Sequence, residues 1–342
     1  MFIWQYSREE KFCRIPDLYV IMKQGGEKMH KERWGFLLLI PILAAALVWA
    51  LHTDDVRNAR LRIGATYMTM NNPFYSVIDE ELRLMIESRG DILLTRDPAL
   101  SQERQNEQIR DLLREHVDLL VVNPVDFLGV TPALEDAQAA GVPVVVVDSQ
   151  VSDPTLARCT IVSDNYNAGV LCAKHLQSTR GSGRIILLEH PRAQSAVDRI
   201  AGFCDTLAGN ENYEIIGRKD CAGQLELAMP ALGELLKEGC RPDIVMALND
   251  PSAMGAMAAL EEYGLLTDVS VYGVDGAPEA KSMIAEGVMT ATVAQSPIQI
   301  GQATAQVAYQ ILSGEPCQRE IIVPVTLLTF ETIGSAALEG WQ

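Results

Sequence analysis

Residues 63–75 read IGATYMTMNNPFY and carry the signals that decide the fold. The apolar pattern of residues 61–67 predicts a strand, which the polar turn Asn71-Asn72-Pro73 ends. Two aromatic side chains, Phe74 and Tyr75, are expected to be exposed just before a helix. A strand, a polar turn and a helix form the first unit of a parallel α/β sheet. Ligands of such sheets bind beyond the carboxyl ends of the strands, so this turn marks a candidate binding position.

The same alternation continues along the chain in two series. Strands are predicted at residues 61–67, 91–95, 117–123, 142–148, 184–189, 213–217, 243–248, 269–274, 289–294 and 321–330. Helices are predicted at residues 77–88, 102–115, 131–140, 165–178, 194–207, 225–238, 252–262, 278–286 and 298–313. We therefore expect two Rossmann-like α/β lobes, each with a parallel sheet, right-handed crossovers and its own core. No linker rich in Gly, Pro or Ser separates the two series.

The amino-acid composition argues against several classes of function. The 342 residues are 48% hydrophobic, as packed cores require, and carry a formal net charge of −17. Binding to nucleic-acid phosphates needs clustered Lys and Arg, so no nucleic-acid partner is expected. The five histidines show no triad or metal-ligand spacing, and the seven cysteines form no Cys-x-x-Cys pair. No enzymatic activity, metal site or cofactor is predicted, and the odd number of cysteines does not indicate a fully paired disulfide framework.

Residues 34–51, WGFLLLIPILAAALVWAL, form an uncharged apolar run. A helix over this run would span about 27 Å, enough for the core of a bilayer. Basic residues precede the run and Asp54 and Asp55 follow it, so residues 1–33 are expected in the cytoplasm and the rest outside. We predict an uncleaved N-terminal membrane helix at the extracytoplasmic face of the cell membrane, facing the periplasm or the cell surface. A cleaved signal peptide, which would release a secreted protein, and a buried soluble helix are the alternatives.

A later translation start is also open. Residues 24–28, QGGEK, stand directly before Met29 and can be encoded by a purine-rich ribosome-binding sequence. A start at Met29 leaves a short basic segment before the apolar run, as export signals require. Residues 1–28 would then not be translated, and recovery of their peptides from the native protein would contradict this hypothesis.

Polar side chains follow most of the predicted strands. They are Asn72, Asn123, Asp148, Asn249, Asp275 and Gln295, and Arg199 lies on a helix that can face the same edge. Sugar hydroxyls both donate and accept hydrogen bonds, which a set of carboxylates, amides and one guanidinium satisfies, while Phe74 and Tyr75 can stack on apolar sugar faces. Each of these residues taken alone also fits a turn former, a helix cap or a core ring.

The ordered motifs of the chain resemble the ribose-binding-protein family, the type I periplasmic substrate-binding proteins of sugar ABC transporters. The motifs are IGATYMTMNNPFY, VVNPVD, VVVVDS, SDNYNAG, SAVDRIAGF, ALND, YGVDG and ATVAQSP, over about residues 60–330. The resemblance implies lobes at residues 60–162 with 296–324 and at residues 163–295 with 325–335, joined by a three-stranded hinge. It implies a sugar held by Asn72, Phe74, Tyr75, Asn123, Asp148, Arg199, Asn249, Asp275 and Gln295.

The chain departs from the family pattern at three positions. A polar residue of the family is Met68 here, an arginine is Ser149, and an aromatic residue is replaced near Gly223. Loss of a cation beside a carboxylate is expected to change specificity, so ribose itself is in doubt. Because Ser149 and Gly223 are small, a different or larger sugar is expected to fit.

The resemblance implies a monomeric receptor that binds a small sugar and delivers it to the permease of an ABC transporter. One alternative is a membrane-anchored sensor that presents its ligand-bound form to a sensor histidine kinase. A sugar-responsive transcriptional repressor shares the two lobes but needs an N-terminal helix-turn-helix, whose place the apolar run takes.

Overall fold

The computed structural model describes residues 60–334, 338, 340 and 341. The predicted membrane or signal segment, residues 34–51, and the segment before it lie outside this range. Within the described range, no helix is both long enough and apolar enough to cross a bilayer.

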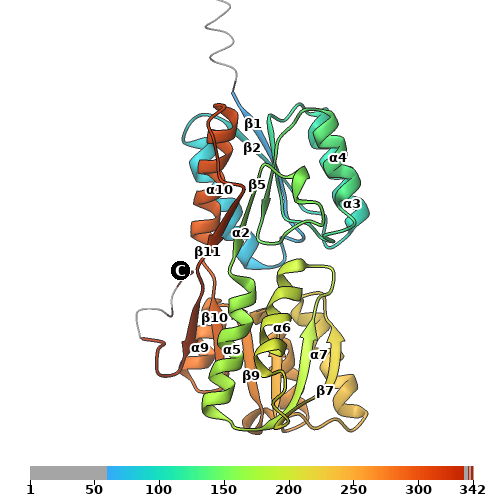
Figure 1. Cartoon of the computed structure of the whole chain (residues 1–342), viewed down its shortest axis with the longest axis vertical. Coiled ribbons are helices and arrows are strands. Elements are labelled where there is room, and N and C mark those ends of the chain that lie inside the picture. The colour runs from blue at the N-terminus through green and yellow to red at the C-terminus, as the bar shows by residue number, and fades with distance from the viewer. Residues whose placement is uncertain (1–59, 335–337, 339, 342) are drawn as a thin grey trace, which may run out of the picture. The chain divides into compact units, whose positions relative to one another are not determined.

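The first sheet has six strands in the order β11-β5-β4-β3-β1-β2, and all its neighbouring pairs are parallel (Figure 1). The strands are β1 (Arg62–Thr66), β2 (Ile92–Arg96), β3 (Leu119–Val122), β4 (Val144–Val147), β5 (Cys159–Ser163) and β11 (Glu320–Val323). The helices packed with it are α2 (Pro73–Glu87), α3 (Gln102–Arg114), α4 (Thr131–Ala139) and α10 (Pro297–Leu312). We call this sheet with its helices the N-terminal lobe.

The second sheet repeats this order as β12-β10-β9-β8-β6-β7. Its strands are β6 (Gly183–Glu189), β7 (Tyr213–Asp220), β8 (Ile244–Ala247), β9 (Ser270–Asp275), β10 (Ala291–Ala294) and β12 (Thr326–Thr329). Its helices are α5 (Asn165–Thr179), α6 (Gln194–Leu207), α7 (Leu225–Lys237), α8 (Asp250–Glu262) and α9 (Pro278–Ala285). This is the C-terminal lobe, and the two sheets confirm the predicted pair of α/β lobes.

Strand alternation builds the core of each lobe. In β3, Leu119 and Val121 pack on the side of α2 and α10, while Leu120 and Val122 pack on the side of α3 and α4. Every residue of β3 and β4 is buried, because helices cover both faces of the sheet. The carboxyl ends of the strands are thereby left as the open edge of each lobe.

The last predicted strand, residues 321–330, is wrong as a single element. It is two strands, β11 in the N-terminal lobe and β12 in the C-terminal lobe, with Pro324 and Val325 between them. Proline has no amide hydrogen to donate to a ladder, so the pairing stops there. β12 also corrects the prediction of a wholly parallel sheet, since it pairs antiparallel with β10. The chain leaves the C-terminal lobe along β10 and returns along β12, so the two strands run in opposite directions.

Helix α2 begins earlier than predicted, at Pro73 rather than at residue 77. Asn72 is its N-cap, and the Asn72 Oδ1 atom accepts a hydrogen bond from the Phe74 amide at 3.0 Å. Proline is favoured in the first turn because its missing N–H has no partner there anyway. Phe74 and Tyr75 therefore belong to the first turn of a helix and not to a loop before it.

Helices α5 and α6 approach closely through two glycines. A Cβ atom at Gly169 would overlap the Arg199 carbonyl oxygen, and one at Gly202 would overlap the Tyr166 carbonyl oxygen. Glycine is needed at both positions because only it allows the two backbones this approach. The close crossing fixes α6, the helix that carries Arg199.

Gly202→Ala is expected to lower the free energy of unfolding by about 1–3 kcal/mol, because the added methyl group forces α6 away from α5. Gly233→Ala is the control: Gly233 lies in α7 with no neighbour within 4 Å of an added Cβ atom. The control should stabilise by about 0.5–1 kcal/mol, as Ala does in helices. Urea denaturation measures both, and equal stabilities of the two variants would contradict the assigned role of Gly202.

Candidate ligand-binding site

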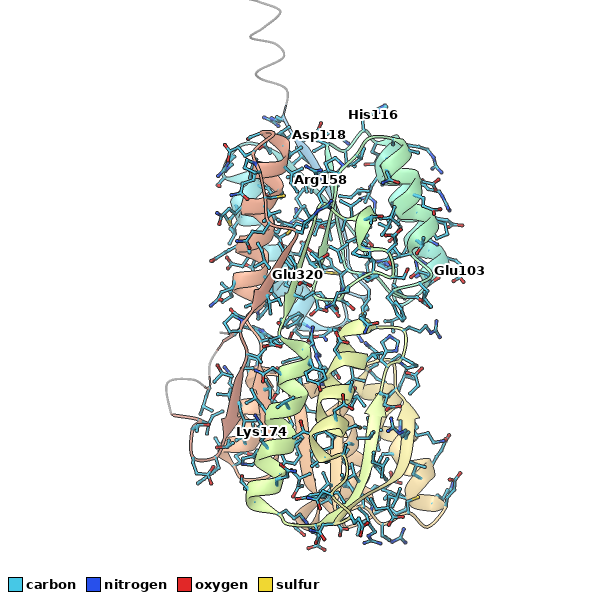
Figure 2. The ribbon with its side chains drawn as sticks, in the orientation of Figure 1. Glu103, His116, Asp118, Arg158, Lys174 and Glu320 are labelled. Atoms are coloured by element: carbon cyan, nitrogen blue, oxygen red, sulfur yellow. The ribbon has the colours of Figure 1, made fainter. Side chains whose placement is uncertain are left out.

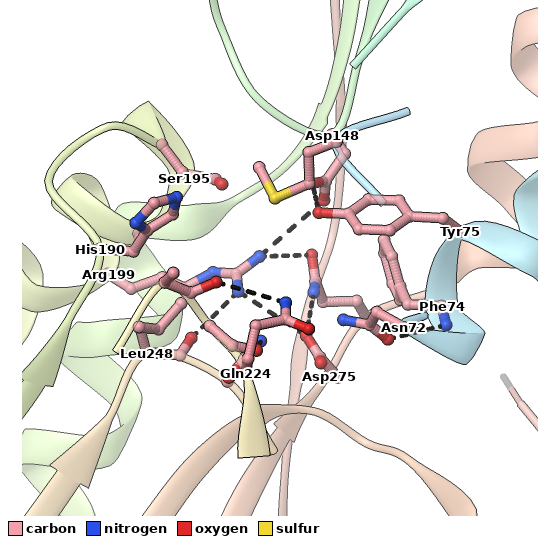
Figure 3. Close-up of a pocket in the computed structure, with 17 residues that line it drawn as sticks. Asn72, Phe74, Tyr75, Asp148, His190, Ser195, Arg199, Gln224, Leu248 and Asp275 are labelled. Atoms are coloured by element: carbon pink, nitrogen blue, oxygen red, sulfur yellow. Dashed lines mark hydrogen bonds and ion pairs between the residues drawn. The ribbon is translucent and has the colours of Figure 1, made fainter. Parts of the chain in front are cut away.

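A small pocket, with a free interior of about 20 Å³, lies where the strand ends of the two lobes face one another. Tyr75 and Asp148 come from the N-terminal lobe, and Arg199 and Asp275 from the C-terminal lobe (Figure 3). The lining residues are Met68, Asn72, Phe74, Tyr75, Asp148, His190, Ala193, Ser195, Ala196, Arg199, Ala222, Gly223, Gln224, Leu248, Asn249, Asp275 and Gln295. All the predicted site residues except Asn123 are among them.

Arg199 is the central cation of the pocket. Its Nε atom donates to Asn165 Oδ1 at 2.8 Å, Nη1 to the Leu248 carbonyl oxygen at 3.0 Å, and Nη2 to Gln295 Oε1 at 3.0 Å. The side chain is 5% exposed and lies within ion-pair distance of two carboxylates. Three hydrogen bonds in different directions hold the planar guanidinium in one orientation.

The two pocket carboxylates come from opposite lobes. Arg199 Nη2 is 4.0 Å from Asp148 Oδ1, and Arg199 Nη1 is 3.7 Å from Asp275 Oδ1. Asp148 directly follows β4 and Asp275 is the last residue of β9, and both have positive φ, 63° and 138°. Such backbone is costly for a residue with a Cβ atom and recurs at binding sites. The strand ends are therefore held in a shape that turns both carboxylates toward Arg199.

Burial governs the electrostatics of this pair. Removal from water raises the pKa of Asp148 and raises that of Asp275 well above its usual range, while Arg199 opposes both shifts. Burial also raises the pKa of Tyr75, so its hydroxyl group stays protonated and donates to Asp148 Oδ2 at 3.2 Å. Without Arg199, the cost of two buried negative charges would be uncompensated.

Several buried acceptors at the pocket have no hydrogen-bond partner among the residues that the structure describes. They are Asp148 Oδ1, Asp275 Oδ2 and the Nε2 atom of His190. An unmet buried acceptor costs about 1–3 kcal/mol, so it is rare unless a ligand or water completes it. The pocket thus offers more acceptors than donors, which matches a guest that presents hydroxyl groups.

Phe74 and Tyr75 are buried, 2% and 6% exposed, so the expectation of two exposed rings is wrong. Their centroids lie 5.6 Å apart in an edge-to-face pair, and Trp341 packs on Phe74 at 5.7 Å. The neighbouring rings remove both side chains from solvent although they remain at the pocket wall. The start of α2 at Pro73 is what turns them inward.

Two of the predicted asparagines, Asn123 and Asn249, also have structural roles. A helix cap was the alternative interpretation of such residues in the sequence. Asn249 caps α8 through Oδ1 and donates to the Gly223 carbonyl oxygen at 3.0 Å. Asn123 lies behind the pocket wall, where its Oδ1 atom accepts from the Met68 amide and its Nδ2 atom donates to Asp148 Oδ2 at 3.3 Å. Asn123 therefore positions Asp148 in this structure and does not line the pocket.

The positions that depart from the family pattern behave differently from one another. Met68 and Gly223 line the pocket, and Gly223 has φ +69°, which a residue with a side chain rarely adopts. Ser149 does not line the pocket, contrary to the expectation that it makes room for a larger ligand. It is fully buried and its Oγ atom accepts from the Ser195 amide at 3.1 Å, which joins the two lobes.

The sequence prediction missed pocket residues that follow β6 and β7. His190 comes directly after β6, Ser195 lies in the first turn of α6, and Gln224 precedes α7. The signal for His190 is present in the sequence, because it is a polar residue directly after a strand, as at the other binding positions. Gln224 gave no comparable signal, because three residues separate it from the end of β7.

The three described histidines have different surroundings. His116 lies at the far end of the N-terminal lobe (Figure 2), His175 bonds to the Tyr272 hydroxyl group at 3.1 Å, and His190 lines the pocket. His30 and His52 lie outside the described range. Within that range, no group of three or more His, Cys, Asp or Glu residues could hold a metal ion, and the six described cysteines are free.

The sequence of this chain is similar to those of known binding proteins. The sequence profile of the periplasmic binding protein domain matches residues 63–316. The ribose import binding protein of Bacillus subtilis is 29% identical over 285 residues, which are 82% of this chain and 91% of that protein.

Solved structures of binding proteins are also similar to this chain. A solute-binding protein of an ABC transporter from Mycobacterium smegmatis, with bound glycerol, is 32% identical with a TM-score of 0.77, over 83% of this chain and 98% of that one. The arabinose-transporter binding protein of Shewanella sp. ANA-3, bound to L-arabinofuranose, is 27% identical with a TM-score of 0.75, over 81% of this chain and 94% of that one.

Proposed function

Since this chain belongs to the periplasmic binding protein family, with two lobes of the type I fold, we propose that it is an extracytoplasmic receptor for a small uncharged sugar or polyol. The ligand is held between the lobes by Asp148, Arg199 and Asp275, with Phe74 and Tyr75 against its apolar face. Asn72, Asn249 and Gln295 complete the contacts, and Asn123 supports Asp148 from behind.

The observation that carries this proposal is the pair of buried carboxylate oxygens, Asp148 Oδ1 and Asp275 Oδ2, that lack a partner within the described residues. The oxygens come from opposite lobes, so one guest with several hydroxyl groups can satisfy both only when the lobes are closed. Closure then removes water from the site and strengthens each hydrogen bond. The relatives described above bind ribose, glycerol and arabinofuranose by their names, and all three compounds are of this class.

A thermal-shift screen of the purified protein tests the proposal. The panel contains D-ribose, L-arabinose, D-galactose, D-fucose, myo-inositol and glycerol, with succinate and lysine as charged controls. Binding at about 100 times Kd stabilises the folded state by about 2.7 kcal/mol, so a true ligand raises Tm by several degrees. The proposal fails if no sugar or polyol raises Tm, or if only the charged compounds do.

Ser149→Ala is expected to weaken binding of the best ligand from this panel by about 1–3 kcal/mol. The change leaves the buried Ser195 amide without its acceptor in the closed form and removes one bond between the lobes. Ser152→Ala is the control, because the Ser152 hydroxyl group pairs with Thr131 of its own lobe at an exposed position. Calorimetric titration decides: equal affinities of the two variants would mean that the contact does not hold the closed form.

Delivery of the ligand to an ABC transporter is part of the proposal, and presentation to a sensor histidine kinase is the alternative. The names of the relatives support transport. Uptake of the best panel sugar in labelled form, with and without the gene, separates the two. Loss of uptake supports transport, whereas unchanged uptake with a lost transcriptional response to that sugar supports sensing.

The membrane tether also belongs to the proposal. The apolar run at residues 34–51 supports it, because its length suits a bilayer and basic residues precede it. A tethered protein stays with the membrane fraction in carbonate washing and retains this segment. A soluble product that begins after residue 51 would point to a cleaved signal peptide.

A further inference from the structure

His190 has the features of a ligand-contacting residue, although the sequence did not predict it at the site. It follows β6 directly, is 6% exposed and lines the pocket, with Ala193 and Ser195 close by in sequence. Figure 3 shows it beside Ser195, at the opposite end of the pocket from Phe74. Its Nε2 atom is buried without a hydrogen-bond partner among the described residues.

The partner of the other ring nitrogen fixes the tautomer. Nδ1 lies 3.3 Å from Asp220 Oδ1, a carboxylate oxygen that can only accept. The proton of the neutral ring therefore sits on Nδ1, and Nε2 keeps its lone pair. Burial lowers the pKa of His190 while Asp220 opposes that shift, so the neutral ring is the form present at neutral pH.

We propose that His190 selects the ligand by accepting, at Nε2, a hydrogen bond from one hydroxyl group on the ligand edge that faces the ends of β6 and β7. This rests on the proposed function and adds a third acceptor to the two carboxylates. The neighbouring lining residues Ala222 and Gly223 carry little or no side chain, so His190 is the hydrogen-bonding side chain on this part of the wall. A ligand hydroxyl group at this edge finds its acceptor in His190.

Selectivity follows from the cost of an unmet acceptor. A ligand that lacks this one hydroxyl group leaves Nε2 desolvated and unpaired, which lowers affinity by about 5- to 150-fold. Removing the imidazole should abolish that discrimination, because the pocket then has no acceptor to leave unpaired. Removal of any other hydroxyl group from the ligand should lower affinity as much in the variant as in wild type, since other residues contact those groups.

The experiment titrates the tightest-binding member of the sugar panel and each of its monodeoxy derivatives by calorimetry. Wild type is compared with His190→Met, which removes both ring nitrogens, and with His190→Asn, which keeps a donor for Asp220 but does not reach the Nε2 position. His175→Asn is the control, since His175 belongs to the same lobe and bonds to Tyr272 outside the pocket. Far-UV circular dichroism and urea denaturation report on folding.

The expected result is that one monodeoxy derivative, penalised in wild type, binds both His190 variants within about threefold of its parent, while the other penalties persist. The assignment is overturned if either folded variant keeps the full wild-type pattern, or weakens all compounds equally. Absence of binding by wild type to every panel member would overturn the proposed function and His190 with it. Sugar binding with an unchanged pattern in the variants overturns His190 alone.

Discussion

Arg199→Met should weaken binding of the best panel sugar by about 3–5 kcal/mol, roughly two to four orders of magnitude in Kd. The guanidinium is the cation that lies near both Asp148 and Asp275, at 4.0 Å and 3.7 Å. Without it, the two buried carboxylates bind protons more readily, and Gln295 and the Leu248 carbonyl group lose a donor. The variant therefore loses two kinds of ligand contact. The guanidinium is gone, and the protonated carboxyl groups of Asp148 and Asp275 are poorer hydrogen-bond acceptors.

Two variants make this result specific. Arg199→Lys keeps the charge but cannot reproduce three hydrogen bonds from one planar group, so it should recover only part of the affinity. Arg218→Met is the matched control in the same lobe: Arg218 pairs with Glu189 at 2.6 Å but is half exposed, and such a pair contributes about 0–1 kcal/mol. Near wild-type affinity of a folded Arg199→Met protein would remove this residue from the site.

Asp148→Asn should weaken binding by about 2–4 kcal/mol. The carboxylate accepts from the Tyr75 hydroxyl group and the Asn123 amide through Oδ2, and leaves Oδ1 for the ligand. An amide has one acceptor oxygen in place of two, so either the support or the ligand contact is lost. Asparagine tolerates the positive φ at this position, so the loss reports on the carboxylate and not on backbone strain.

Asp148→Ala should be worse, because alanine also strains a backbone with φ 63°. Asp153→Asn is the control, since Asp153 caps an exposed turn of the same lobe and asparagine caps equally well. Titration calorimetry with the best panel sugar compares the three. An Asp148→Asn protein with the affinity of the control would show that this carboxylate does not contact the ligand.

Most of the architecture was predictable because it depends on local pattern. Short, mostly apolar runs such as residues 117–123 and 142–148 are typical of strands covered on both faces, and the helical stretches between them favour parallel neighbours. The carboxyl ends of parallel strands meet at one edge, so the sequence predicts that Asp148, Asp275 and Gln295 gather there, and all three line the pocket.

The rest depends on contacts between residues far apart in the chain, which no local pattern encodes. The direction of β12 follows from the side on which the chain re-enters the second sheet. Whether Asn123 lines the pocket or braces Asp148, and whether Ser149 makes room or joins the lobes, depends on partners 25 and 46 residues away. The burial of Phe74 similarly needs Trp341, from the other end of the chain.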